Sequence, residues 1–317
     1  DVLVWNQQWL RAAELVDTAP DAESPVVLGL RARWIYADGD ATQARELVEK
    51  AVRKAPRDLE LRALQRRLFT QSGRLTSRVI ASARGAPTLG QVELSLSQSI
   101  HRLQLTFDME QGTRPISLDA GWSYGATYGA GGWWTFAPGW SWGADISVGA
   151  PAAIVPRVRV RSRLTLPFRP WLDGGLSYTY RRFTEAIDTH GMSAALGLTL
   201  RSELRLDATY WLTHVGLRNE GGDESSRWVQ AVGFAAGRRI VEGLEWRVGV
   251  AHGAEAERLP TAFQLLDLVN DSAYLGLRIF AASFVAIEPL YGVAWRGPRG
   301  GTRQVQHTLE VGLVVKR

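Results

Sequence analysis

Cysteine is absent from the 317 residues of the chain, and this absence removes three kinds of chemistry. Without thiols the protein has no disulfide framework, no cysteine nucleophile and no thiolate metal site. Such a composition fits the periplasm and the outer membrane, where a stray thiol can be oxidised. Hydrophobic residues make up 45% of the chain, a normal share for a folded protein, which argues against wholesale disorder.

Long apolar runs are missing as well. No stretch reaches the roughly 18 to 20 apolar residues of a membrane-spanning helix. The chain also lacks a basic segment followed by an apolar one at its start, so it shows no signal peptide. If the protein is exported, we expect its signal to have been removed from this sequence.

Catalytic motifs are few. The five histidines lie far apart, without the short-spaced pairs of a zinc site. Gly-x-Ser-x-Gly occurs twice, around Ser123 and Ser141, but neither match precedes the helical pattern that a nucleophile elbow requires. Both segments fit strands better, with aromatic residues on one side and glycine and serine on the other. We therefore predict no enzyme activity, no metal site and no cofactor.

Residues 1 to about 73 have the spacing of α-helices. Apolar residues recur at steps of three and four from Ala44 to Val52 and from Leu61 to Leu68. Pro56 ends the first of these stretches, and Asp58 can cap the next one. The sequence therefore predicts a short all-α domain at residues 1–73.

A finer pattern in this part resembles the tetratricopeptide repeat. The small-residue and proline positions of that repeat are matched by Ala32, Gly39, Ala44, Ala51 and Pro56. The next glycine in register is Gly73, about 34 residues after Gly39, which is the period of the repeat. Small residues are needed there because two helices cross closely. We predict that a periplasmic or envelope protein docks on this segment through Ala32, Gly39, Ala44 and Ala51, with a plain helical bundle as the alternative.

Beyond Gly73 the apolar period changes from about 3.6 to 2, as in β-strands. In the segment from Arg157 to Phe168, arginines at alternate positions point to one side of a strand, while valine and leucine point to the other. The same alternation recurs at residues 92–97, 103–109, 116–124, 172–181, 204–210, 244–250, 285–296 and 305–316. Turn residues punctuate these stretches, for example at Glu110–Gly112 and Asn219–Asp223.

The charged face of these strands must contact water, and the apolar face must contact a continuous apolar medium. A closed barrel in a lipid bilayer meets both demands. We expect roughly 12 to 16 strands and favour 14, because bacterial single-chain barrels have even strand numbers. An aromatic cluster suits the interfacial girdle of such a barrel, namely Trp133, Trp134, Phe136, Trp140 and Trp142.

A soluble β-sandwich would also alternate, but the number of strands and the charge on their polar side favour the barrel. The predicted fold class is therefore α+β in two domains. A short, all-α, tetratricopeptide-like segment occupies residues 1–73, and an antiparallel transmembrane β-barrel occupies residues 74–317.

This order of parts resembles the YaiO-like outer-membrane barrel family. The resemblance is carried by Gly39 to Pro56 in the repeat and by the strand-like runs Tyr178–Phe183 and Ala208–Leu212. The order is also similar to that of the cellulose and poly-N-acetylglucosamine export porins, although these have larger barrels and many more repeats. The resemblance implies a protein of the outer membrane of a Gram-negative bacterium, with periplasmic helices as a docking handle and a role linked to an exopolysaccharide.

The row of arginines is the best candidate for a functional site. We predict a pore lining of Arg157, Arg159, Arg161, Arg163, Arg181, Arg205 and Arg247, together with Glu93, Asp108 and Asp119. Because lining charges set the selectivity of a pore, this lining predicts a path for an exopolysaccharide or another anionic solute. The alternative is a network of ion pairs that plugs the bore. A plugged barrel would be a membrane anchor that presents the helices to an envelope complex.

Two other uses of these residues are less favoured. Nucleic-acid binding is not predicted, because the arginines alternate with apolar residues and do not share a face with stacking aromatic rings. An enzyme inside the barrel would need a histidine beside Ser123 or Ser141, or paired carboxylates such as Asp108 and Asp119. Pairing with arginine is the better explanation of the carboxylates, because an inward charge must be compensated.

Overall fold

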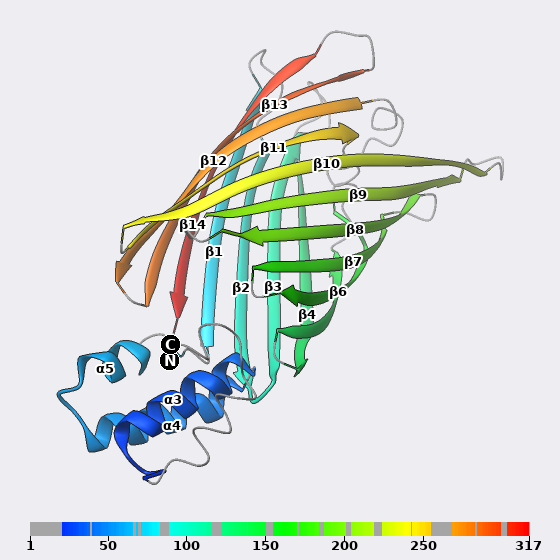
Figure 1. Cartoon of the computed structure of the whole chain (residues 1–317). Coiled ribbons are helices and arrows are strands. Elements are labelled where there is room, and N and C mark those ends of the chain that lie inside the picture. The colour runs from blue at the N-terminus through cyan, green and yellow to red at the C-terminus, as the bar shows by residue number, and fades with distance from the viewer. Residues whose placement is uncertain are drawn as a thin grey trace.

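The described residues of the computed structural model form three helices followed by a closed barrel of fourteen strands (Figure 1). The structure describes residues 21–38, 40–65, 68, 71–82, 89–115, 122–137, 139–149, 155–169, 171–183, 187–200, 204–218, 224–241, 243–254, 268–282, 284–298 and 303–316. Among the helices in these ranges, none is long and apolar enough to cross a membrane. The predicted antiparallel barrel after short N-terminal helices and the favoured strand number of 14 are both confirmed, whereas the tetratricopeptide-like character of the helices stays a prediction.

The helices are α3 (Pro25–Ala37), α4 (Ala41–Lys54) and α5 (Leu59–Gln65). A side chain caps the free backbone N–H groups at the start of each one. Ser24 accepts a hydrogen bond at the start of α3, and Asp40 does so at the start of α4. Asp58 accepts hydrogen bonds at the start of α5, as the sequence predicts.

Small residues bring α3 and α4 together. The side chains of Ala32, Ala44 and Ala51 are fully buried between the helices. At Gly29 an added Cβ would lie only 2.6 Å from the Leu61 side chain, so α5 also depends on a small residue in α3. The predicted small residues therefore do occupy the helix contacts. Gly39 lies outside the described residues.

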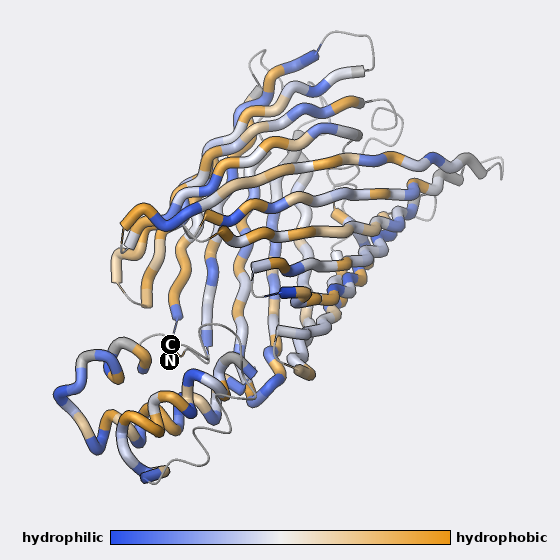
Figure 2. Tube along the Cα trace, viewed as in Figure 1, coloured by the Kyte–Doolittle hydropathy of each residue, from blue (hydrophilic) through white to orange (hydrophobic). Residues whose placement is uncertain are grey.

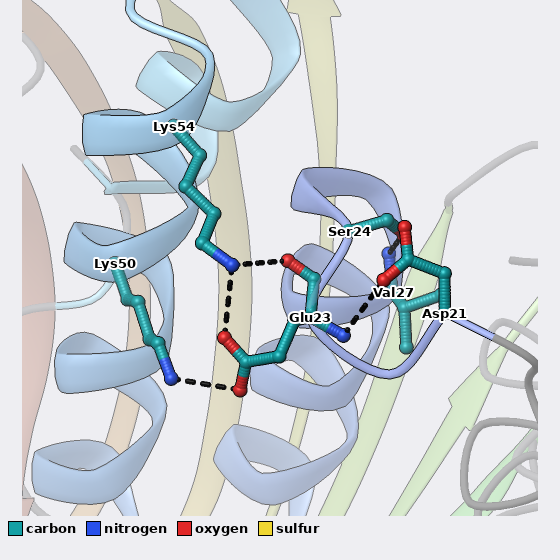
Figure 3. Close-up of polar contacts among 6 residues, drawn as sticks. All are labelled: Asp21, Glu23, Ser24, Val27, Lys50 and Lys54. Carbon is teal, nitrogen blue, oxygen red and sulfur yellow. Dashed lines mark hydrogen bonds and ion pairs between the residues drawn. The ribbon is translucent and has the colours of Figure 1, made fainter.

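A carboxylate clamp joins the start of α3 to the end of α4 (Figure 3). The Glu23 carboxylate lies 2.8 Å from Lys50 Nζ and 2.9 Å from Lys54 Nζ. Lys54 also donates to the backbone carbonyl of Glu23 at 2.7 Å. The hydrogen bonds from the two lysines lower the pKa of Glu23 to about 2. The clamp therefore consists of charged groups at neutral pH.

The barrel is an antiparallel meander in which each strand pairs with its neighbours in the chain. The ring closes where the first strand pairs with the last, from Ser72 opposite Lys316 to Ser82 opposite Gln306. The strands are β1 (Gln71–Ser82), β2 (Leu89–Ile100), β3 (Leu103–Pro115), β4 (Trp122–Ala137), β5 (Trp140–Gly149), β6 (Val158–Arg169), β7 (Leu172–Arg182), β8 (Ile187–Thr199), β9 (Arg205–Arg218), β10 (Glu224–Val241), β11 (Leu244–Ala254), β12 (Leu268–Ala282), β13 (Val285–Pro298) and β14 (Gln304–Lys316).

One predicted turn is wrong. The residues Glu110–Gly112 lie inside β3, which continues to Pro115. Gly112 pairs with Gln91 of β2 and with Gly125 of β4, and the Glu110 side chain makes lumen contacts, so neither residue breaks the strand. Gly112 therefore lies inside a paired strand and not in a loop.

The strands alternate between an apolar outer face and a polar inner face (Figure 2). Large apolar side chains are exposed on the outside of most strands, for example Phe107, Ile146, Leu196 and Phe234. Of the predicted aromatic cluster, four members are exposed in this way, and Trp134, Phe136 and Trp140 contact one another in sequence. Trp133 occupies an inward position of β4 and packs against Gly143 of β5. The belt of exposed apolar side chains fits hydrocarbon and not water.

The helices lie at the end of the barrel that carries its short turns (Figure 1). The turn between β2 and β3 consists of His101 and Arg102, and His101 has a positive φ of 51°. This turn contacts the start of α4. Thr42 Oγ1 accepts from the His101 N–H at 3.1 Å, His101 Nδ1 lies 3.0 Å from the Asp40 carboxylate, and Arg102 pairs with Asp38. The helical part is therefore held to the rim of the barrel by polar contacts.

Among the described residues the last helix ends at Gln65 and the first strand begins at Gln71. Gly73, the predicted end of the helical domain, is already in β1. Whether residues 1–73 and 74–317 are two folding units stays a prediction.

Candidate functional site in the barrel lumen

The predicted arginine row projects into the barrel from β6 and pairs with carboxylates of β5 and β3. Arg161 Nε donates to both oxygens of Asp145 at 2.8 and 2.9 Å. Arg159 donates to Ser147 Oγ at 3.0 Å, and its Nη1 lies 3.7 Å from Glu110 Oε2. The positive charges of Arg159 and Arg161 are therefore compensated by carboxylates, as expected for charges that are partly removed from water.

These contacts extend into a chain of polar groups around the middle of the lumen. Arg78 Nε donates to Glu310 at 2.7 Å, and its Nη1 donates to Gln91 at 3.4 Å. Gln91 in turn donates to Glu110 at 2.8 Å, which leads to Arg159. We call this chain the middle girdle. It joins β14, β1, β2 and β3 to β6.

Glycines on β4 let the girdle pass from β3 to β6. A Cβ added to Gly131 would lie 2.6 Å from Asp145 Cβ, and one added to Gly129 would lie 2.9 Å from Ser147 Cβ. Side chains of β5 therefore occupy the space that β4 leaves empty. The close approach depends on the missing Cβ atoms.

A second set of ion pairs lies nearer the short turns. Arg205 donates to both oxygens of Asp173 at 2.8 Å and to Asp207 at 2.8 Å. Asp207 also lies 3.5 Å from Arg247. The predicted lining residues Arg205 and Arg247 are thus joined through one carboxylate across β9 and β11.

The pairs continue around the wall from β10 to β13 and on to β1. Glu245 accepts from Arg239 at 3.0 Å and lies 4.0 Å from Arg278. Glu288 lies 2.8 Å from Arg278 Nε and 3.0 Å from Arg74 Nη2. We call all of these pairs, from Asp173 to Arg74, the lower girdle.

Two cavities remain between these side chains. One has a volume of about 920 Å³ and is lined by members of the lower girdle, among them Arg74, Arg247 and Glu288. The other has a volume of about 580 Å³ and is lined by Arg163, Arg181 and inward groups of β7 to β12. The ion pairs therefore fill only part of the lumen.

Basic residues outnumber acidic ones at the inward positions of the described strands. The basic set is Arg74, Arg78, Arg157, Arg159, Arg161, Arg163, Arg181, Arg205, Arg227, Arg239, Arg247, Arg278, Arg296 and Lys316. The acidic set is Glu93, Asp108, Glu110, Asp145, Asp173, Asp207, Glu245, Glu288 and Glu310. The inner wall of the described strands therefore carries an excess of positive charge.

Most of the predicted lining residues thus lie on one inner surface. Glu93 and Asp108 take inward positions on β2 and β3, and exposed Arg157 directly precedes β6. Asp119 lies outside the described residues. Sequence reasoning missed Glu110 and Asp145 as partners, although both stand at inward positions of alternating segments.

A closed antiparallel barrel with an outer apolar belt and a charged, partly hollow interior defines the class of outer-membrane β-barrels. Solved structures share this fold with the chain. A CymD monoaromatic hydrocarbon channel aligns with a TM-score of 0.55 at 10% identity, over 80% of this chain and 91% of its own. The toluene transporter TbuX of Ralstonia pickettii aligns with a TM-score of 0.55 at 9% identity, over 81% and 93%. A bacterial polysaccharide outer membrane secretin aligns with a TM-score of 0.50 at 12% identity, over 78% and 99%.

Similarity at this level of identity shows the fold alone. No protein-family model matches the chain. No curated protein matches it either. The chain therefore has the fold of bacterial outer-membrane channels and porins, and no family is assigned to it.

Proposed function

We propose that this outer-membrane barrel is a channel that takes part in the export or guidance of an exopolysaccharide or another anionic solute. The observation that carries the proposal is the excess of arginine on the inner wall beside two cavities. Guanidinium groups bind carboxylate and phosphate in two-pronged fashion, so an arginine-lined path suits solutes that carry these groups.

Two resemblances support a polysaccharide over a small ion. The order of helices and barrel is similar to that of YaiO-like proteins, and membership of that family belongs to this proposal. One structural neighbour is itself named a polysaccharide secretin. The aromatic hydrocarbon channels share the fold, but the charged lumen of this chain does not suit an apolar solute.

We further propose that the helices face the periplasm. Outer-membrane barrels have short periplasmic turns and longer extracellular loops. The helices lie at the short-turn end, in contact with the turn between β2 and β3. In this position the helical part can present a docking surface to a periplasmic or envelope protein.

The test is single-channel recording of the refolded chain in a planar bilayer under a salt gradient. We expect a steady current whose reversal potential shows preference for anions. Arg163→Gln with Arg181→Gln removes two charges that line the cavity of about 580 Å³, and we expect the anion-to-cation permeability ratio to fall by roughly a factor of two or more. Arg53→Gln, an exposed residue of α4, makes the same charge change outside the barrel and should leave the ratio unaltered.

The second candidate is a sealed barrel that anchors a docking domain. The two girdles favour it, because their ion pairs compensate many of the charges on the inner wall. Folded, inserted protein that passes no current, in the parent chain and in the double variant, would reject the channel and leave the anchor. A current that shows no preference for anions would instead mean that the arginines do not make the channel selective for anions.

A further inference from the structure

Four of the five histidines lie outside the lumen, on the outer face of the barrel. They are His190 on β8, His214 on β9, His252 on β11 and His307 on β14. Each shares its face with exposed apolar residues of its own strand, such as Met192 beside His190 and Leu309 beside His307. Alternation fixes this direction, because residues two apart on a strand point the same way.

All four histidines also lie toward the same end of the barrel. β8 and β14 run from the loop end toward the helix end, and His190 and His307 stand near their beginnings. β9 and β11 run the other way, and His214 and His252 stand near their ends. The histidines therefore form a partial belt at the rim far from the helices, above the exposed apolar side chains.

Aromatic neighbours hold the best-defined part of this belt. The hydroxyl of Tyr178 lies 2.8 Å from His190 Nδ1, and the Tyr180 ring lies 5.1 Å from the His190 ring. The His214 ring lies 6.2 Å from that of His190 and 4.9 Å from that of Trp228. These residues come from four consecutive strands, β7 to β10.

The tyrosine contact orients the His190 ring, because the Tyr178 hydroxyl occupies Nδ1 and leaves Nε2 to face a ligand. Nε2 donates a hydrogen bond in the protonated imidazole, or in the neutral tautomer that carries its hydrogen there. The same arrangement recurs across the barrel, where the Tyr291 hydroxyl lies 2.7 Å from His307 Nδ1. Arginines stand at this rim as well. Exposed Arg182 lies on the outward register of β7, opposite Asp188 of β8, and Arg303 pairs with Asp271 beside His252.

We propose that the surface formed by Tyr178, Tyr180, Arg182, His190, His214 and Trp228 binds the phosphate of an outer-leaflet lipid. The Arg182 guanidinium and the imidazole N–H groups supply donors for a phosphate. The tyrosine and tryptophan rings supply the amphipathic contact that such residues make at a membrane interface. Beneath them the outer wall is apolar at Met192 and Leu196, which suits acyl chains. The proposal does not require an open lumen.

The test uses native mass spectrometry of the full chain in detergent, with diphosphoryl lipid A as the phosphorylated lipid and phosphatidylcholine as the zwitterionic comparison. We expect lipid A to bind more tightly than phosphatidylcholine. The triple variant Arg182→Gln, His190→Phe, His214→Phe keeps the ring packing and removes the donors. We expect it to bind lipid A roughly tenfold more weakly, as for the loss of at least one charge-assisted hydrogen bond.

Arg238→Gln is the matched control. Arg238 stands on the outward register of β10, near the short turns, and should leave lipid A binding unchanged. The single variant His190→Gln provides a second test in case the triple variant does not fold. Glutamine can still form hydrogen bonds, so this variant should weaken lipid A binding by a smaller factor. Equal binding of lipid A to the parent chain and the triple variant would overturn the proposal. If millimolar inorganic phosphate displaced lipid A, the site would be one for free phosphate, and the proposal of a lipid ligand would be wrong.

Discussion

Gly131 and Gly132 are neighbours on β4, yet only one of them has room for a side chain. Gly131 faces inward, and an added Cβ would lie 2.6 Å from Asp145 Cβ and 2.7 Å from the Ala144 carbonyl oxygen. Gly132 faces outward, and its nearest neighbour would be the Leu103 side chain at 3.6 Å, an ordinary contact. The inner glycine thus has a steric role that the outer one lacks.

We expect Gly131→Ala to destabilise the barrel by about 1–3 kcal/mol, since Asp145 and the backbone of β5 must move. Gly132→Ala should change stability by less than about 0.5 kcal/mol, or raise it slightly, because alanine has fewer unfolded conformations. Urea unfolding of the two variants in the same lipid vesicles makes the comparison. Equal stabilities would show that β4 does not depend on a missing Cβ at position 131.

Glu23 offers a residue-scale measurement outside the membrane. Its carboxyl has a pKa of about 2 in the folded chain, below the ordinary 4.5, because Lys50 and Lys54 donate to it. A depressed pKa contributes stability above the ordinary value, and this contribution is lost as the pH falls from about 4.5 toward 2.

Carbon-13 NMR of the labelled Glu23 carboxyl should therefore show a midpoint near 2. The double variant Lys50→Ala, Lys54→Ala should return the midpoint toward 4.5, with Arg53→Ala on the same helix as the control. A midpoint near 4.5 in the parent chain would mean that the clamp is not formed in solution.

At the scale of elements, the contact between α3 and α4 depends on small residues. Ala44 is fully buried between α3 and α4, so Ala44→Arg forces a charged side chain into an apolar contact. We expect a cost of at least about 3 kcal/mol, enough to open this short helical segment. Gln43→Arg, on the exposed side of the same turn, should be tolerated.

Chymotrypsin cleaves after aromatic residues and not after arginine, so the substitution adds no new cleavage site. Faster cleavage would therefore report separation of the helices. In the Ala44→Arg protein we expect rapid cleavage at Trp34 and Tyr36, with the barrel still folded by its mobility on unheated gels. The Gln43→Arg protein should resist cleavage like the parent chain. Unchanged resistance of the Ala44→Arg protein would show that the helix contact is not the one described.

The strand pattern was predictable from the sequence because lipid and lumen impose opposite demands on alternate residues. The segment from Arg157 to Phe168 illustrates this, since its arginines face inward and its valines outward. The partner of each arginine was not predictable. Arg159 reaches Glu110, three strands away, only because glycines on β4 let side chains pass above them. Sequence alternation gives direction, whereas the identity of a partner depends on register and on the space between strands.

The same limit explains the turn misplaced at Glu110–Gly112. Glycine beside charged residues is typical of loops, but glycine also marks a strand whose neighbour approaches closely. Only the pairing of Gly112 across both β2 and β4 separates the two cases.

On the scale of the whole molecule, two polar girdles and two cavities divide one lumen. The girdles compensate much of the inward charge, and the remaining excess is basic. A solute with several acidic groups could exchange ion pairs with successive arginines as it moves, whereas a small neutral solute gains nothing from the row. This is why the salt-gradient recording tests the whole interior and not a single residue.

The pairing of β1 with β14 has a consequence for how the protein is made. Ser72 meets Lys316 only after every intervening residue has been synthesised and exported. Until that moment β1 and the last assembled strand both present unpaired backbone edges, which invite association with other chains. During biogenesis these two unpaired strand edges must therefore be kept from pairing with other proteins of the envelope. The exposure ends when β14, the final strand of thirteen residues, pairs with β1.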